Sequence, residues 1–294
     1  MKANLLHRCY DITGEAITWL PDRKTLLWVD IDRGILHQYD LENGVVEAHS
    51  FPEMITAIIP WKGHNEEVIL AMKNRMVAYH LTKCDYRVLV ELTDLQPWLR
   101  TNDCKASPDG RILYGVMRTH HQNNVGGLYC ISHDLSCNKV LENQIIPNGI
   151  VWNKAGDRMF YADSGRHCIE EYGYSPQDGV IGKRSVIEVS SEYGVPDGMT
   201  IDAEDNLWVA HWGGYGVYVW NPSTGKLMDK VEVPVPNVAS CTFGGIGSNK
   251  LFITTALDGL SDEQLREYPL SGSVFVADTP DVVPGENHYP FMNE

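Results

Sequence analysis

Six polar side chains recur at equivalent places along this chain, each about a dozen residues before a short apolar run. In chain order they are Glu15, Thr56, Asn102, Asn148, Asp197 and Ser240. Carboxylate and amide oxygens are the donors that Ca²⁺, Mg²⁺ and Mn²⁺ prefer. We therefore expect Glu15, Asn148 and Asp197 to hold one divalent metal ion and to leave positions open for water and a substrate. The plainer alternative is that the Asn-Gly and Asp-Gly pairs are ordinary turn dipeptides.

The apolar runs that follow these positions repeat with a long and nearly constant period. Their central residues are Trp28, Leu70, Tyr114, Tyr161, Trp208 and Phe252, separated by 42, 44, 47, 47 and 44 residues. A period of this length is typical of solenoids and propellers. A second strand-like run follows each core, with turn pairs such as Asn43-Gly44 between runs. Six units of four short strands predict an all-β, six-bladed β-propeller rather than a sandwich or barrel.

In a closed propeller, equivalent positions of the repeats converge on the central axis, and this would bring the polar side chains together. We expect residues 1–294 to form one such domain. The first repeat begins with its inner strand near Glu15, and the last has three recognisable strands ending near Val276. Residues 4–10 are left over. We expect them to supply the outer strand of the last blade, which would cover an exposed sheet edge.

The composition excludes several classes of protein. A formal charge of −15 argues against binding to nucleic acid or to an anionic membrane surface. No apolar run approaches the ~20 residues that span a bilayer, and the N-terminus lacks a signal-peptide core. Seven cysteines without CxxC spacing are typical of reduced thiols. We expect a cytoplasmic protein that is a monomer or a weak homo-oligomer.

Other motifs carry weaker signals. His120 and His121 form a pair that could contact a substrate at a pocket rim, although neighbouring histidines on a loop are more often simply exposed. The glycine-rich segments 125–127 and 213–216 do not open a predicted helix, which argues against a nucleotide site. The sequence contains no Gly-x-Ser-x-Gly elbow, which argues against a serine hydrolase.

Several of these motifs together resemble one known family. They are Gly14-Glu15, Arg100-x-Asn102-Asp103 leading to Pro108-x-Gly110-Arg111, Asn148-Gly149, Pro196-Asp197-Gly198-Met199 and Ser240-Cys241-x-Phe243-Gly244-Gly245. The chain resembles, over nearly its whole length, the regucalcin and gluconolactonase family, also called the senescence marker protein family. Its members are six-bladed propellers with one divalent metal on the axis, and many hydrolyse sugar lactones.

The resemblance implies roles for particular residues. Glu15, Asn148 and Asp197 match the metal ligands of the family, and Asp197 also matches the residue proposed as general base. Arg100 and Asn102 match its substrate-binding pair. Two positions depart from the family. Cys104 stands where a glycine is common, and His120 stands where animal members have a substrate-contacting glutamate, so their sugar preference does not transfer.

The expected activity is metal-dependent hydrolysis of a sugar lactone to the open-chain sugar acid. Ca²⁺ is the first choice of metal, with Zn²⁺, Mg²⁺ and Mn²⁺ as alternatives, and the expected partner is the small lactone itself. Three other functions stay open. The chain could hydrolyse another ester or an organophosphate at the same site, act as a non-enzymatic calcium-binding regulator, or serve as an interaction platform.

Overall fold

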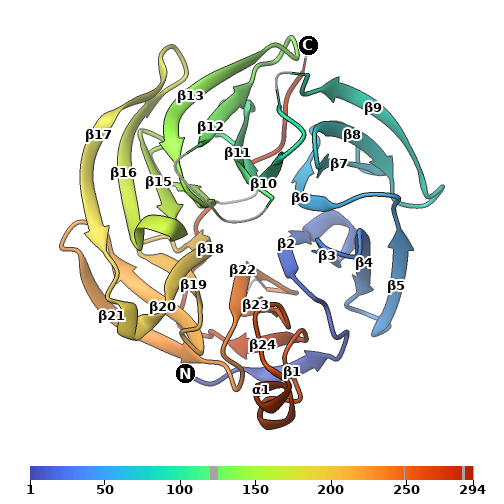
Figure 1. Cartoon of the computed structure of the whole chain (residues 1–294), viewed down its shortest axis with the longest axis vertical. Helices are drawn as coiled ribbons and strands as arrows, with labels where there is room; N and C mark the ends of the chain where they lie inside the picture. The colour runs from blue at the N-terminus through green and yellow to red at the C-terminus, as the bar shows by residue number, and fades with distance from the viewer. Residues whose placement is uncertain (94, 120–124, 248, 287–288, 294) are drawn as a thin grey trace.

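The computed structural model describes residues 1–93, 95–119, 125–247, 249–286 and 289–293. These residues form six four-stranded antiparallel sheets, arranged as blades around a central axis (Figure 1). The prediction of an all-β, six-bladed β-propeller is therefore confirmed. One short helix, α1 (Asp262–Glu267), lies between the last two strands, and it begins with a capping box in which Ser261 and Gln264 exchange hydrogen bonds. No helix among the described residues is long and apolar enough to cross a membrane.

The first three blades follow one another along the chain, and each begins with its innermost strand. Blade 1 contains β2 (Gly14–Leu20), β3 (Thr25–Asp30), β4 (Ile35–Asp40) and β5 (Val45–Ser50). Blade 2 contains β6 (Ile55–Pro60), β7 (Glu67–Met72), β8 (Arg75–His80) and β9 (Asp85–Glu91). Blade 3 contains β10 (Leu99–Ala106), β11 (Ile112–Arg118), β12 (Gly126–Ile131) and β13 (Cys137–Gln144).

The last three blades repeat the same order, except that the sixth takes its outer strand from the start of the chain. Blade 4 contains β14 (Pro147–Trp152), β15 (Arg158–Asp163), β16 (Cys168–Ser175) and β17 (Gly179–Glu188). Blade 5 contains β18 (Val195–Ile201), β19 (Leu207–Trp212), β20 (Gly216–Asn221) and β21 (Lys226–Glu232). Blade 6 contains β22 (Val238–Gly244), β23 (Lys250–Thr255), β24 (Val274–Asp278) and β1 (Asn4–His7).

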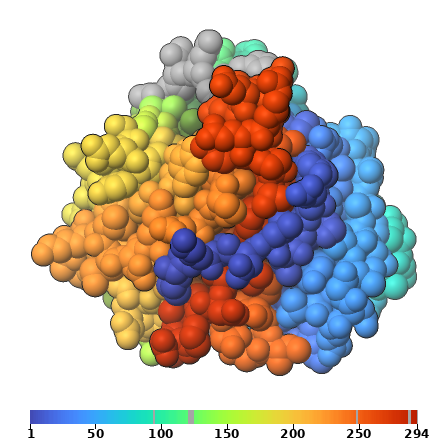
Figure 2. Space-filling model, turned by 90° about the horizontal axis from the view of Figure 1, so that it is seen from below, coloured from blue at the N-terminus to red at the C-terminus, as the bar shows by residue number. Residues whose placement is uncertain are grey.

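Blade 6 combines the first strand of the chain with the last three. β1 pairs antiparallel with β24, with Asn4 opposite Val276 and Leu5 opposite Phe275. Figure 2 shows the N-terminal residues, in dark blue, lying across the red and orange C-terminal part of the chain. Leu6 packs against the apolar cluster between blades 1 and 6. The N-terminal strand thus covers the edge that β24 would otherwise expose.

The hydrophobic core is divided among the junctions between blades. Six clusters of buried side chains are present, and each joins the facing surfaces of two neighbouring sheets. Trp28 of blade 1 and Phe252 of blade 6 are fully buried in the junction that closes the ring. Packing of this kind fixes the spacing between blades, and so it fixes the width of the central channel.

In all six innermost strands, regular pairing with the neighbouring strand is interrupted near the start of the strand. In β14 the interruption falls between Pro147 and Ile150, and in β18 it falls between Pro196 and Met199. Such bulges bend a strand and re-aim its side chains. The polar positions that recur in the sequence lie in or directly beside these bulges, at one end of the channel, which we call the mouth.

Candidate active site at the mouth of the central channel

The mouth contains a cavity of about 690 Å³, lined by residues from the strands of blades 1, 3, 4 and 5 and from neighbouring loops, including those that contain Met54 and Asp258. Five residues singled out from the sequence line it together. They are Glu15, Arg100, Asn102, Asn148 and Asp197. Trp212 of blade 5 and Asp258, in the loop that follows β23, also line the cavity.

A chain of hydrogen bonds connects the proposed substrate side to the proposed metal side. Arg100 Nη1 donates to Asn102 Oδ1 at 2.6 Å, and Asn102 Nδ2 donates to Asn148 Oδ1 at 2.7 Å. Asn148 Nδ2 in turn donates to Ser164 Oγ at 2.7 Å, and Ser164 donates to the Pro196 carbonyl at 2.5 Å. The sequence pattern separated these residues into two groups, whereas the fold joins them into one network across blades 3, 4 and 5.

Thr56 and Ser240 occupy the same repeated position but do not line the cavity. Thr56 Oγ1 is 2.7 Å from Thr101 Oγ1, which itself donates to the Met72 carbonyl at 2.7 Å. Ser240 is buried against the glycine that follows Asp197. These two side chains therefore help to pack neighbouring inner strands.

Two carboxylates converge at the mouth with little compensating charge. Burial, followed by the negative charge of Asp103, raises the pKa of Glu15 to about 8. Burial also raises the pKa of Asp197, and the charges of Glu15 and Asp103 add to this effect. Among the described residues, no ion pair involves Glu15 or Asp197. A cation placed between these oxygens would favour the ionised form of both.

Asp103 is a site neighbour that sequence reasoning passed over. It falls in the bulge of β10 directly after Asn102, and Lys105 lies two residues further along the strand. Burial raises the pKa of Asp103, while the positive charge of Lys105 opposes the shift. The sequence shows an acid directly after Asn102. It does not show on which side of the strand that acid lies, because neighbouring side chains in a strand point to opposite faces.

Arg100 is the one cationic side chain that lines the cavity among the described residues. Burial lowers its pKa, and the negative charges of Asp32, Glu15, Asp197 and Asp258 act in the opposite direction. Its Nη1 atom also donates to the Thr101 carbonyl at 2.9 Å. The guanidinium is thus held in place by its own strand and faces an acidic surrounding.

The residue types at the mouth fit a hard divalent cation. Two carboxylates and one amide carbonyl supply oxygen donors of the kind that Ca²⁺, Mg²⁺ and Mn²⁺ accept. Asn148 Oδ1 accepts one hydrogen bond, so its second lone pair can face a metal. Among the described residues, no three His, Cys, Asp or Glu side chains form a metal-binding group. Any metal at the mouth would therefore depend on the asparagine.

Glycines let the inner strands approach closely around the site. A Cβ atom at position 149 would lie 2.6 Å from the Asp197 carbonyl oxygen, and one at position 198 would lie 2.8 Å from Ser240 Oγ. The glycines after Asn148 and Asp197 therefore allow neighbouring inner strands to pack closely, which an ordinary turn residue would not be needed for. Cys104 is buried and continues regular pairing opposite Tyr114, so the departure from the family pattern leaves β10 intact. His120 lies outside the described residues.

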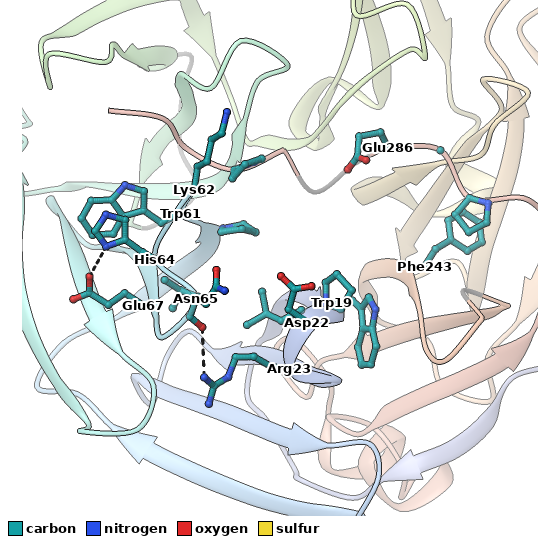
Figure 3. A pocket seen from close by; sticks show the side chains of 18 residues that line it. Trp19, Asp22, Arg23, Trp61, Lys62, His64, Asn65, Glu67, Phe243 and Glu286 are labelled. Atoms are coloured by element: carbon teal, nitrogen blue, oxygen red, sulfur yellow. Dashed lines mark hydrogen bonds and ion pairs between the residues drawn. The ribbon is translucent and has the colours of Figure 1, made fainter. Parts of the chain in front are cut away.

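A second cavity, of about 420 Å³, lies at the opposite end of the inner strands. It is lined by the last residues of β2 and β6 and by the C-terminal segment near Glu286. Figure 3 shows Asp22 beside Trp19 in this cavity, and His64 next to Trp61. His64 stacks on Trp61 and contacts Glu67, so much of its polar surface is already engaged. The converging oxygen donors are at the mouth, which makes the mouth the candidate active site.

Comparison with known proteins finds related sequences that cover most of the chain. The SMP-30/Gluconolactonase/LRE-like region matches residues 13–257. The chain is 32% identical over 267 residues to YvrE of Bacillus subtilis, a provisionally named sugar lactone lactonase, covering 90% of this chain and 91% of YvrE. It is 31% identical over 245 residues to the pentonolactonase XacC of Haloferax volcanii, covering 83% of this chain and 81% of XacC.

The fold is also that of a solved relative. The structure of a calcium-binding protein, regucalcin, from Agrobacterium tumefaciens superposes with a TM-score of 0.90 at 22% identity, covering 100% of this chain and 98% of that one. The match to the family covers most of the chain and includes all five of the residues that converge at the mouth. The chain therefore belongs to the SMP-30/gluconolactonase/LRE-like family.

Proposed function

We propose that this protein hydrolyses a sugar lactone to the open-chain sugar acid, with a divalent metal ion bound at the mouth. The observation that carries the proposal is the convergence of Glu15, Asn148 and Asp197 beside Arg100 in one cavity. The lactonase relatives support the reaction class, because XacC is named as a pentonolactonase and YvrE provisionally as a sugar lactone lactonase.

Glu15, Asn148 and Asp197 are the residues that would hold the metal, and Ca²⁺ is our first choice. When bound, a divalent cation supplies a Lewis acid that polarises the lactone carbonyl. The chain supplies the rest of the surroundings. Asn102 fixes the Asn148 side chain through a 2.7 Å hydrogen bond, and Ser164 fixes it from the other side. The Asn148 carbonyl is therefore presented in one orientation.

Hydrolysis adds the oxygen of water to the carbonyl carbon and breaks the bond between that carbon and the ring oxygen. The ring oxygen takes up a proton, and the new carboxylic acid releases one. Asp197, which lines the cavity, would accept the proton that water loses. Arg100, whose Nη1 atom is anchored to Thr101 and Asn102, would donate from its remaining N–H groups to a ring or hydroxyl oxygen of the sugar.

A lactone panel on chelator-treated protein, followed by addition of Ca²⁺, Mg²⁺, Mn²⁺ or Zn²⁺, tests the proposal. We expect no turnover in the metal-free protein and recovery with at least one of these ions. Aryl esters and organophosphates form the second arm of the panel, and faster turnover of these would favour the alternative hydrolase. Tight Ca²⁺ binding without turnover of any lactone would favour the non-enzymatic regulator. Full lactonase activity without metal would refute the mechanism.

A further inference from the structure

The rim of the mouth carries two acidic side chains that the proposed mechanism does not use. Asp32 follows β3 in blade 1, and Asp258 follows β23 in blade 6. Both line the cavity and both are exposed. Burial lowers the pKa of the Arg100 guanidinium, and the negative charges of Asp32 and Asp258, with those of Glu15 and Asp197, oppose this shift.

Residues 12 and 13 bind the Asp32 side chain and the Asp258 backbone at one corner of the mouth. Thr13 Oγ1 donates to Asp32 Oδ2 at 2.6 Å. The backbone N–H of Asp258 donates to the Ile12 carbonyl at 2.9 Å, and the Asp258 carbonyl accepts from Asn237 Nδ2 at 2.8 Å. The loops that carry Asp32 and Asp258 are therefore both anchored by the two residues that directly precede β2.

The charges that line the cavity are unbalanced. Four acids and one base line it among the described residues, and a divalent cation would offset only part of the difference. A cleft lined by one sign of charge focuses the electric field towards a ligand. Arg100 offsets only one of the four negative charges.

We propose that Asp32 and Asp258 select for lactones that carry no ionised group and speed the release of the sugar acid. This inference rests on the proposed function. A carboxylate or phosphate on the far end of the sugar would enter a negative field, and like charges at a binding site are an effective way to reject a competing ligand. Hydrolysis converts a neutral lactone into an anion, so the same field disfavours the product.

A matched pair of lactones tests this selectivity. Glucono-γ-lactone and glucaro-γ-lactone share the ring and differ at the last carbon, which carries a hydroxyl group in the first and a carboxylate in the second. We expect the wild-type protein to prefer the neutral lactone in kcat/KM. The double variant Asp32→Asn/Asp258→Asn should reduce this preference about three- to tenfold. High salt should reduce it in the wild type as well, because exposed charges are screened.

Asp22→Asn is the control, since Asp22 lines the cavity at the opposite end of the inner strands (Figure 3) and its replacement removes one negative charge from the chain, where the double variant removes two. It should leave the preference between the two lactones unaltered. An equal preference in the wild type and the double variant would overturn the inference, and so would an equal change with Asp22→Asn.

A binding measurement separates failure of the inference from failure of the proposed function. Calorimetry on chelator-treated protein compares gluconate with the uncharged polyol sorbitol. We expect the double variant to bind gluconate several-fold more tightly than the wild type does, with sorbitol unaffected. If the wild type hydrolyses neither lactone, the proposed function fails, but the gluconate comparison still decides whether Asp32 and Asp258 repel anions. No gain in gluconate affinity contradicts the inference.

Discussion

Asn102 of blade 3 donates its side-chain amide to the side-chain carbonyl of Asn148 in blade 4, with 2.7 Å between Nδ2 and Oδ1. The same Nδ2 atom donates to the Pro147 carbonyl at 2.8 Å. Both asparagines are buried, at 7% and 6% exposure, so neither bond is easily replaced by water. The relationship means that a residue expected to contact substrate also determines the orientation of an expected metal ligand.

Replacing Asn102 by alanine should therefore affect both folding and metal binding. The Pro147 carbonyl and the Asn148 side chain would each lose a buried donor, which costs about 1–3 kcal/mol of unfolding free energy. Urea denaturation of chelator-treated protein measures this loss, and calorimetric titration with Ca²⁺ measures the accompanying fall in metal affinity.

Asn43→Ala is the matched control, because Asn43 is exposed and bonds only within its own turn. Its effect on the unfolding free energy should stay within about 0.5 kcal/mol. Equal losses in the two variants, or unaltered Ca²⁺ affinity in Asn102→Ala, would show that the hydrogen bond to Asn148 does not organise the metal site.

Asp197→Asn separates the catalytic role of Asp197 from its structural role. We expect kcat to fall about 10²- to 10⁴-fold, which is the usual contribution of a positioned general base. The unfolding free energy of the metal-free protein should not fall, because the substitution removes a buried carboxylate that Glu15 and Asp103 destabilise. Steady-state kinetics and urea denaturation give the two values, and a near-normal kcat would remove Asp197 as the base.

The repeats were predictable from sequence because apolar strand cores such as Trp28 and Trp208 recur with a regular period and face the blade junctions. The convergence of Glu15, Asn148 and Asp197 followed from that repetition. The positions of the bulges could not be predicted in this way. A bulge adds an unpaired residue to a strand, and the alternation of apolar and polar residues along the strand does not reveal it. Ala16 has a φ of 54°, a left-handed conformation that the presence of an alanine does not predict.

Contacts between side chains of different blades also could not be predicted from the sequence. The bond from Asn102 to Asn148 joins residues in different repeats, and it depends on how closely two inner strands approach. The second cavity depends on the C-terminal segment near Glu286 lying beside the ends of β2 and β6. This segment lies outside the six repeats, so their period does not constrain where it lies.

His211 should make stability depend on pH between about 4 and 6.5. Burial lowers its pKa from 6.5 to about 4, and its ring lies between the Tyr193 carbonyl and Trp220 Nε1. In this window the unfolded chain binds a proton at His211 that the folded chain does not. Stability therefore falls as pH decreases, by about 2 kcal/mol at pH 5.

Comparing urea denaturation at pH 7 and pH 5 for the wild type and His211→Gln measures that dependence. The variant should lose about 2 kcal/mol less between the two pH values than the wild type does. Exposed His167, replaced by asparagine as the control, should leave the wild-type difference nearly intact. An identical pH dependence in His211→Gln would show that the buried imidazole is not responsible.

Deleting residues 1–10 should lower thermal stability markedly. The deletion removes β1, exposes the edge of β24 and takes Leu6 out of the cluster between blades 1 and 6. Leu5→Thr is the control, because the Leu5 side chain is exposed and the strand is retained. Thermal denaturation followed by circular dichroism measures both. An unaltered melting temperature after the deletion would mean that β1 does not help to close the ring.

Gly149→Ala tests whether close approach of the inner strands sets the geometry of Asp197. The added Cβ would lie 2.6 Å from the Asp197 carbonyl oxygen and 2.8 Å from Met199 Cγ, so β18 must shift. Gly149 does not have a positive φ, and the effect is therefore steric rather than conformational. Since a displacement of about 1 Å at a reacting group can cost 10²-fold in rate, kcat/KM should fall on that order.

Gly182→Ala makes the same chemical change where no heavy atom lies within 4 Å of the new Cβ. It should leave kcat/KM unaffected and alter the unfolding free energy by less than about 1 kcal/mol. Lactone kinetics on both variants decide the point. A fully active Gly149→Ala protein would mean that the mouth tolerates movement of β18, and the position of Asp197 would then be set by the metal rather than by the packing of the inner strands.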